Sequence, residues 1–307
     1  MSGDGRRTEL DALAVTLLVG CCAIWGLGQV AAKVGLSEIP PLLQASVRSL
    51  GAALLLLLWC RLRGLDVLKA DGTGRAGLQA GLLFAAEFGC IFVGLQYTTA
   101  SRMAVFLYLA PFVVALGMPL ISRSEKLRTV QACGLALAFG GVVWAFAEGF
   151  TRPAAGATQW LGDALGIAAA LLWGLTTLTM RGTALATALP EKSLLYQLGI
   201  SALALGLASW VQGEATPQHL SALGWTVLAF QTVVITFASY LVWFWLVRHY
   251  PATRISAFTL LTPMFGLLAG VLLLNDPLTP RLLTALAAVC VGIWLVNRPP
   301  ALPRASR

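Results

Sequence analysis

Charged side chains are scarce in this chain. They make up 11% of its 307 residues, whereas 58% of the residues are hydrophobic and the mean hydropathy is +0.81. Soluble domains carry about 25% charged residues, because they must cover their exterior with polar groups. A composition this poor in charge excludes a soluble globular protein and indicates a protein surrounded by lipid.

Residues that commonly hold metals or carry catalysis are also few. The two histidines, His219 and His249, lie near loops, and no G-x-x-x-x-G-K-[ST] phosphate-binding run occurs. The six cysteines lie in or beside apolar runs, without the spacing of a disulfide framework or a zinc site. We therefore expect no metal, no cofactor and no use of ATP. The cysteines are Cys21, Cys22, Cys60, Cys90, Cys133 and Cys290.

Long apolar runs are what the chain has in abundance. Each run is about twenty residues long, enough to cross about 30 Å of hydrocarbon as a helix. Their hydrophobic residues do not alternate with polar ones as in a barrel strand, so the need to satisfy backbone groups within lipid favours helices. The predicted fold class is an all-α integral membrane protein with ten transmembrane helices. The predicted spans are 12–32, 41–60, 76–98, 102–122, 128–148, 160–181, 191–212, 223–247, 253–274 and 280–297.

The distribution of basic residues predicts how the spans are oriented. With the N-terminus in the cytoplasm, sixteen lysines and arginines fall on the cytoplasmic side and four fall outside, with Arg48 left within a span. This is the usual bias of membrane proteins, so the net charge of +8 reports topology and not nucleic-acid binding. We expect a multi-pass protein of the cytoplasmic (inner) membrane with both termini in the cytoplasm. The outer four are Lys33, Arg102, Arg152 and Arg281.

The chain repeats a pattern of motifs. Ile24–Leu27 (IWGL) recurs as Leu172–Leu175 (LWGL), and Arg102–Pro111 (RMAVFLYLAP) matches Arg254–Pro263 (RISAFTLLTP). Chance similarity is the alternative, but the motifs recur in the same order. Because each half holds five spans, an odd number, the halves must have opposite orientations in the membrane, which is the usual architecture of secondary transporters. The predicted halves are residues 1–150 and 151–307.

Several of these motifs together resemble a known family. They are the Trp-Gly pairs of the first and sixth spans, Arg48 near the start of a leucine-rich second span, and the Ala110-Pro111 and Thr262-Pro263 pairs. An acidic loop and a glycine-rich last span follow each of these proline pairs. The combination resembles the drug/metabolite transporter superfamily, in its ten-helix EamA-type branch, over nearly the whole chain. The resemblance implies export of small metabolites by alternating access.

Two further positions point within that branch. Glu87 and Tyr108 lie where the amino-acid exporters, including those for aromatic amino acids, have similar residues. Ala86 stands where that group has an aromatic residue, which is a departure from the pattern. The resemblance therefore implies an amino-acid exporter and leaves a preference for aromatic substrates open.

Two charges are predicted to lie inside the membrane. Charges there cost several kcal/mol and are candidates for function. Arg48 lies in the second span and Glu87 near the middle of the third. One interpretation is a structural ion pair that holds the two spans together. In the other, Glu87 binds a substrate ammonium or takes a proton.

Aromatic and polar residues recur at helical spacing in the spans. Trp25 and Gln29 share one face of the first span, and Trp173 and Thr177 repeat this in the sixth. Facing walls of a substrate cavity explain the repetition, whereas packing in the core or against lipid is the alternative. Lys33 and Arg181, near span ends, are expected to contact headgroups. Tyr108 in the fourth span and Tyr240 and Trp243 in the eighth complete the candidate substrate residues.

The leading functional hypothesis is a secondary exporter of amino acids or similar small metabolites. A multidrug or toxic-cation exporter, with Glu87 binding the cation, is the alternative among transporters. An intramembrane transferase is the alternative among enzymes, although such enzymes usually carry polar clusters at the interface that this chain lacks. The expected partners are the lipid bilayer and a small-molecule substrate, without nucleic acid, and the sequence is compatible with a monomer.

Overall fold

The regular structure of the protein is helical throughout the part that is described. The computed structural model describes residues 11–121, 129–153, 155–250, 258–259 and 261–296. The start of the predicted ninth span and residue 297 of the tenth lie outside these ranges. The helices of the first half are α1 (Ala12–Gly35), α2 (Pro41–Leu62), α3 (Gly74–Tyr97), α4 (Ala100–Leu107), α5 (Ala110–Ile121) and α6 (Thr129–Thr151). Those of the second half are α7 (Gln159–Gly182), η1 (Ala184–Thr187), α8 (Pro190–Val211), α9 (Ala222–Ala229), η2 (Phe230–Ala238), α10 (Ser239–His249), α12 (Leu261–Leu274) and α13 (Pro280–Val296).

These helices confirm the predicted fold class. Within the described ranges, 8 helical segments are long and apolar enough to cross a membrane, and they coincide with the first eight predicted spans. Two shorter apolar helices, Leu261–Leu274 and Pro280–Leu295, occupy the last two. The protein is an all-α, ten-helix membrane protein.

The fourth span is broken between α4 and α5. The amides of Tyr108 and Leu109 donate to carbonyl groups only three residues earlier, at 3.2 and 3.1 Å. Pro111 explains the break, because it has no N–H and its ring would clash with the carbonyl of the residue four positions earlier. Pro119 lies inside α5 without interrupting it. The break places Tyr108 between the two helices of this span.

The eighth span contains the π-helix η2 between α9 and α10. The Thr236 hydroxyl donates to the Gln231 carbonyl five residues earlier, at 2.7 Å. The Gln231 amide donates across to the Ala31 carbonyl of α1, at 3.1 Å. π-Helices are rare and frequent at functional sites, and this one lies against α1 and α2.

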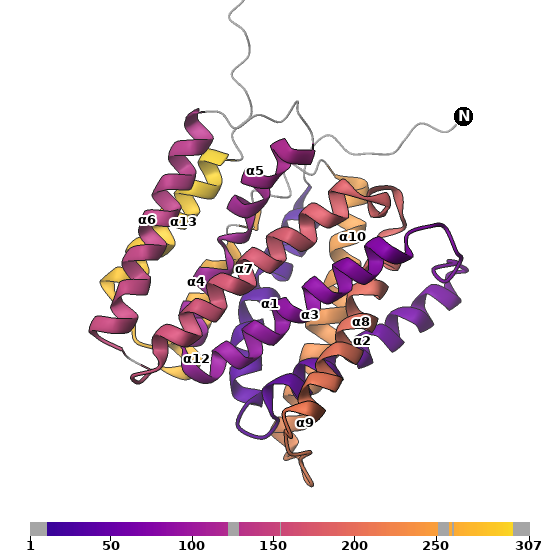
Figure 1. Cartoon of the computed structure of the whole chain (residues 1–307), viewed down its shortest axis with the longest axis horizontal. Coiled ribbons are helices and arrows are strands. Elements are labelled where there is room, and N and C mark those ends of the chain that lie inside the picture. The colour runs from indigo at the N-terminus through magenta and orange to yellow at the C-terminus, as the bar shows by residue number, and fades with distance from the viewer. Residues whose placement is uncertain (1–10, 122–128, 154, 251–257, 260, 297–307) are drawn as a thin grey trace, which may run out of the picture.

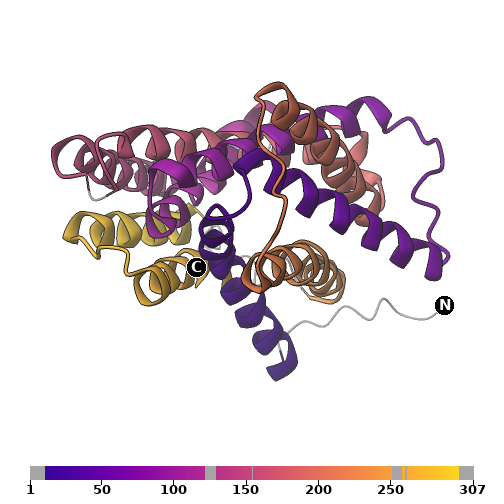
Figure 2. The same cartoon turned by 90° about the horizontal axis from the view of Figure 1, so that it is seen from below.

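Helices at corresponding places in the two predicted halves pack on each other. The helices α6 and α13 pack along each other at one end of the molecule, and α2 packs on α8 (Figure 1). The helix α1 crosses the middle of the bundle and contacts α12 on one side and η2 and α10 on the other (Figure 2). Likewise, α7 packs on α4 and α5 and on α3. If the repeated Trp-Gly motif makes α1 and α7 equivalent, the contacts of α1 with α12 correspond to those of α7 with α4 and α5. The contacts of α1 with η2 and α10 then correspond to those of α7 with α3. Two related halves would produce this pattern, and the division at residue 150 remains a prediction.

Helix α2 shows how lipid inverts the usual placement of residues. Its Leu54 and Leu58 side chains are 58% and 55% exposed, whereas Gln44 and Ser49 are fully buried and Arg48 is 5% exposed. In a soluble helix the leucines would be buried and the polar groups would face water. Polar side chains of this helix therefore collect inside the bundle.

Candidate functional site

The glycine of each Trp-Gly pair lies at a close helix crossing. A Cβ atom at Gly26 would lie 2.7 Å from the Gly266 nitrogen of α12, and one at Gly174 would lie 2.5 Å from the Val113 Cβ of α5. Both distances are too short for real Cβ atoms, so glycine is required for these helices to approach. The repeated motif therefore has a packing role, and it holds the preceding tryptophan beside the crossing.

Trp25 forms an aromatic cluster with two predicted substrate residues of α10. Its ring centroid lies 5.2 Å from that of Trp243, edge to face, and 6.2 Å from that of Tyr240. The indole nitrogen of Trp25 donates to the Ser239 hydroxyl at 2.8 Å. All three rings are half-buried. The structure thus brings together Trp25, Tyr240 and Trp243, which we call the aromatic cluster.

Tyr108 and Trp173 form a second aromatic pair. Their ring centroids are 5.8 Å apart and their planes nearly perpendicular, at 86°. Tyr108 is buried and Trp173 is half-buried. The Thr177 hydroxyl donates to the Trp173 carbonyl of its own helix at 3.0 Å. That bond uses the hydroxyl proton of Thr177 and leaves its oxygen able to accept, so the role of Thr177 in substrate binding stays a prediction.

Gln29 also has an unusual environment. Its Oε1 atom is buried and has no hydrogen-bond partner in the protein, although the residue as a whole is only half-buried. An amide oxygen held in this way has lost water without gaining a donor, which costs about 1–3 kcal/mol. Gln29 therefore remains a candidate substrate contact.

Arg48 and Glu87 are close but do not form the predicted ion pair. Both are 5% exposed and they interact electrostatically. No hydrogen bond or salt bridge joins them within the described residues, where the side-chain ion pairs involve Arg102 and Lys192. The Arg48 guanidinium instead lies over the Phe88 ring, 4.1 Å from its centroid, and 5.2 Å from that of Phe92. The direct ion pair is absent because the two rings of α3 hold the guanidinium.

A buried charged network, which the sequence did not predict, joins the starts of α4 and α7 to the end of α6. Arg102 donates to Asp163 through Nε at 3.0 Å and Nη2 at 2.6 Å, and to Glu148 through Nη1 at 3.0 Å. Their exposed fractions are 3%, 0% and 5%. Bidentate arginine–carboxylate bonds are among the strongest in proteins. These residues form a rigid tie between the two halves.

Hydroxyl groups complete this Arg102 network. Thr98 donates to Asp163 at 2.6 Å, and Thr279, just before α13, donates to Glu148 at 2.8 Å. In the sequence, Arg102 lay at a span end and was taken as one of the outer basic residues. Glu148 and Asp163 lie at span ends on the same predicted side as Arg102, and this coincidence is the sequence signal that could have revealed the network.

Lys33 has a structural role that differs from the expected contact with headgroups. Its ammonium donates to the Leu95 carbonyl and, at 2.9 Å, to the Thr98 carbonyl. These groups end α3, where the carbonyl dipoles favour a positive charge. Arg181, the counterpart of Lys33 in the repeat, is exposed as expected.

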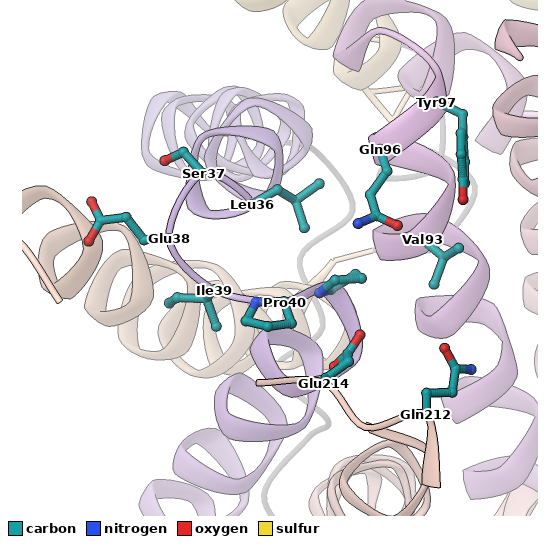
Figure 3. A pocket seen from close by; sticks show the side chains of 11 residues that line it. Leu36, Ser37, Glu38, Ile39, Pro40, Val93, Gln96, Tyr97, Gln212 and Glu214 are labelled. Atoms are coloured by element: carbon teal, nitrogen blue, oxygen red, sulfur yellow. The ribbon is translucent and has the colours of Figure 1, made fainter. Parts of the chain in front are cut away.

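A pocket of about 470 Å³ opens at the end of the bundle where α1, α3 and α8 finish (Figure 3). Glu214 accepts hydrogen bonds from the Leu42 and Leu43 amides at 3.1 and 2.9 Å, which caps α2. Glu38 accepts from the Ser221 hydroxyl and amide, and these bonds lower its pKa. Polar groups thus dominate this pocket. It is lined by Leu36, Ser37, Glu38, Ile39, Pro40, Pro41, Val93, Gln96, Tyr97, Gln212 and Glu214.

A second pocket, of about 520 Å³, lies at the opposite end of the bundle. Its lining is largely apolar and includes Met118, Ile121, Met180 and Leu185. None of the predicted substrate residues lines either of these two pockets.

At the end of the bundle that carries the second pocket, an ion pair connects the loop before α3 with the start of α8. Lys192 lies 2.8 Å from Asp71 and also donates to the Lys69 carbonyl at 2.5 Å. The hydrogen bond from Lys192, followed by that from Thr73, lowers the pKa of Asp71 from 3.8 to about 2.

Across the described residues, no group of three or more His, Cys, Asp or Glu side chains is placed to hold a metal ion.

Similar proteins are known from bacteria. An uncharacterized transporter of Bacillus subtilis, YvbV, is 29% identical over 92% of this chain and 90% of its own length. A Pseudomonas aeruginosa protein, PA1977, is 31% identical over 85% of each chain. A protein of Escherichia coli K12 named a probable amino-acid metabolite efflux pump is 24% identical over 93% of this chain and 94% of its own.

A solved crystal structure shares the fold. It is 16% identical in sequence, has a TM-score of 0.64, and covers 92% of this chain and 97% of its own. The model of the EamA-like transporter family matches the chain twice, at residues 12–147 and 160–298. Together these matches extend over most of the ten helices described above. The chain therefore belongs to the EamA-like transporter family.

Proposed function

We propose that the protein is a secondary transporter that exports amino acids or similar small metabolites from the cytoplasm by alternating access. One observation carries the proposal: two opposite, unpaired charges, Arg48 and Glu87, lie buried beside an aromatic cluster built by both halves of the chain. Secondary transporters commonly bind substrate at the interface of two halves. An amino acid presents both charges and an apolar side chain.

The two openings support alternating access. Pockets of about 470 and 520 Å³ lie at opposite ends of the bundle. A transporter of this kind exposes one central site to each side in turn, through movements of one half against the other. The name of the Escherichia coli relative, a probable amino-acid metabolite efflux pump, points to the same class of substrate.

Transport by purified protein in liposomes tests the proposal. Vesicles loaded with one unlabelled amino acid should accumulate its labelled form by counterflow, and a panel of the twenty amino acids should include at least one substrate. The control is the same lipid without protein. If no amino acid or related metabolite is exchanged by folded protein, the proposed substrate class is wrong.

A toxic-cation exporter is the second candidate, because the buried Glu87 could bind a cation. Arg48, which is close to Glu87 and equally buried, argues against this function, since a like charge would repel the cation. Counterflow of ethidium in the same liposomes distinguishes the two candidates. The transferase alternative lost its support once the chain was placed in a transporter family.

The direction of export requires an orientation. We propose an inner-membrane protein with both termini in the cytoplasm, on the basis of the bias in basic residues. In that orientation the polar pocket around Glu214 opens outside, and the apolar pocket around Met180 opens to the cytoplasm. A single chain holds both halves of the proposed site, so a monomer suffices.

A further inference from the structure

We infer that Arg48 and Glu87 together recognise a zwitterion, with Arg48 binding the substrate carboxylate and Glu87 its ammonium, while the aromatic cluster receives the apolar side chain. The inference rests on the proposed transport of amino acids and specifies how the site would select them. It replaces the structural ion pair expected from the sequence with two separate binding groups.

The environment of Arg48 leaves one edge of its guanidinium for a ligand. Phe88 and Phe92 lie against the group through cation–π contacts, 4.1 and 5.2 Å from its central carbon to their centroids. The Nε and Nη2 atoms are buried and have no hydrogen-bond partner in the protein. These two atoms form one edge of the guanidinium and can donate two parallel bonds to a carboxylate. The two phenylalanine rings thus hold the Arg48 guanidinium in place, and the edge that can bind a carboxylate has no partner in the protein.

Glu87 is the complementary group. Its Oε2 atom is buried and has no hydrogen-bond partner in the protein, and the residue is 5% exposed. An ionised carboxylate in such a place needs a cation or several donors to offset its lost hydration. An ammonium group brings a positive charge and three donors. Glu87 can therefore accept from an ammonium without breaking any bond within the protein.

The positions of the two charges suit one small molecule. Arg48 is the eighth residue of α2 and Glu87 is the eleventh from the end of α3, so their depths from the same end of the bundle are about 10 and 15 Å at 1.5 Å per residue. Glu87 directly precedes Phe88, the ring under the Arg48 guanidinium, and Phe88 and Tyr240 pack against the same buried apolar cluster. Tyr240 belongs to the aromatic cluster, with Trp25 at 6.2 Å. Polar and apolar recognition groups are therefore adjacent.

Energetics favours a ligand that carries both charges. Each buried charge without a partner is strongly destabilising, and a molecule that pairs with both at once removes two penalties. An amine would leave Arg48 unpaired, and a carboxylic acid would leave Glu87 unpaired. A site that binds its substrate through buried polar groups binds analogues that lack the matching group much more weakly, because the buried groups of the site are then left unpaired. The site should therefore select zwitterions over either half-molecule.

Competition against labelled L-phenylalanine, or L-leucine if it is the better substrate, tests this selection in liposomes. The competitors are the unlabelled amino acid, its decarboxylated amine and its N-acetyl derivative. Loss of one charge-assisted contact should weaken each half-molecule by about 10- to 100-fold. Equal competition by all three would overturn the inference.

Two variants assign the charges to their partners. In Arg48→Gln, the preference for the amino acid over the amine should fall by about 10-fold or more, because the contact with the carboxylate is lost. In Glu87→Gln, the preference over the N-acetyl derivative should fall similarly. Ratios within one variant do not depend on how much protein folds. Arg48→Lys keeps the charge and should retain part of the preference, and Arg63→Gln, at the end of α2, should leave both ratios unchanged.

The outcomes separate this inference from the proposed function. If the wild type exchanges no amino acid, the proposed function and the inference are both wrong. If it exchanges amino acids and both variants keep the wild-type ratios, the transport function stands and the zwitterion site is wrong. If the amine binds as tightly as the amino acid in the wild type, Glu87 alone recognises substrate and the role of Arg48 is rejected.

Discussion

The indole nitrogen of Trp25 donates a hydrogen bond of 2.8 Å to the hydroxyl of Ser239. This bond fixes a ring of α1, in the first half of the chain, against α10, in the second. Ser239 itself donates to the Ile235 carbonyl of η2 at 2.5 Å. The orientation of the aromatic cluster is therefore tied to the π-helix.

Removal of this hydrogen bond should weaken transport. Trp25→Phe and Ser239→Ala each remove one partner, and a typical hydrogen bond contributes about 1 kcal/mol, or about fivefold in apparent affinity. Because both changes remove the same bond, the double variant should be less impaired than the sum of the two effects. Counterflow at a range of substrate concentrations measures the three affinities. Trp210→Phe is the matched control, since Trp210 is 78% exposed on α8. Full additivity would show that the bond does not act in transport.

Arg102→Gln should destabilise the fold. The change leaves Asp163 and Glu148 buried without their cation, which costs about 3–5 kcal/mol. Thermal unfolding in detergent should show a clear fall in Tm relative to the wild type. Arg152→Gln, at an exposed position near the same end, should change stability by less than about 0.5 kcal/mol.

A triple variant separates pairing from packing in this network. Arg102→Met with Glu148→Gln and Asp163→Asn removes all three charges, and buried ion pairs are often replaced by neutral groups at little cost. The triple variant should therefore be more stable than Arg102→Gln alone. Equal Tm values for the two variants would contradict a charge-based explanation.

The pair between Asp71 and Lys192 should contribute to stability in a defined pH range. The folded pKa of Asp71 is about 2, below its ordinary value of 3.8. A lowered folded pKa means that the contribution is complete above pH 3.8 and is lost as the pH falls towards about 2. The difference in Tm between the wild type and Asp71→Asn should therefore be constant from pH 8 to about 5 and shrink below pH 4. Lys192→Gln should behave like Asp71→Asn, and Lys69→Gln, in the same loop, should not. A difference that persists at pH 2 would contradict the assignment.

Reporter fusions test the proposed orientation. Fusions after Gly72 and after Arg307 should report the cytoplasm, and one near Gly156 should report the outside, because sixteen of the basic residues then lie in the cytoplasm. An outside signal at Arg307 would contradict an even number of spans with the N-terminus inside.

The sequence predicted the helices well because lipid imposes simple rules. The need to satisfy every backbone group within about 30 Å of hydrocarbon determines the length and type of each span, and α2, at Pro41–Leu62, ends within two residues of its prediction. The break before Pro111 is explained by the missing N–H of that proline. The π-helix η2 has no comparable signal in the sequence, since it depends on contacts such as that of Gln231 with α1.

Side-chain contacts were harder to predict than spans. Trp25, Tyr240 and Trp243 were predicted substrate residues, and the structure places them in one cluster. Whether that cluster contacts substrate remains a prediction. The ion pair of Arg48 with Glu87 was expected from charge and depth alone, but the rotation of α3 brings Phe88 to the guanidinium instead. Such contacts depend on helix rotation, which span length and hydropathy do not determine.

The Arg102 network also constrains how the protein is made. Glu148 follows Arg102 by 46 residues and Asp163 follows it by 61. Arg102 therefore enters the translocon before either carboxylate has been synthesised, and an arginine without a partner is costly in hydrocarbon. Its place in the first turn of α4, at the end of a span, allows the side chain to remain in the interfacial region until α6 and α7 are inserted. Biogenesis of the bundle then includes a charge-pairing step, after α7 is inserted and before the last four spans, that joins the first half to the start of the second.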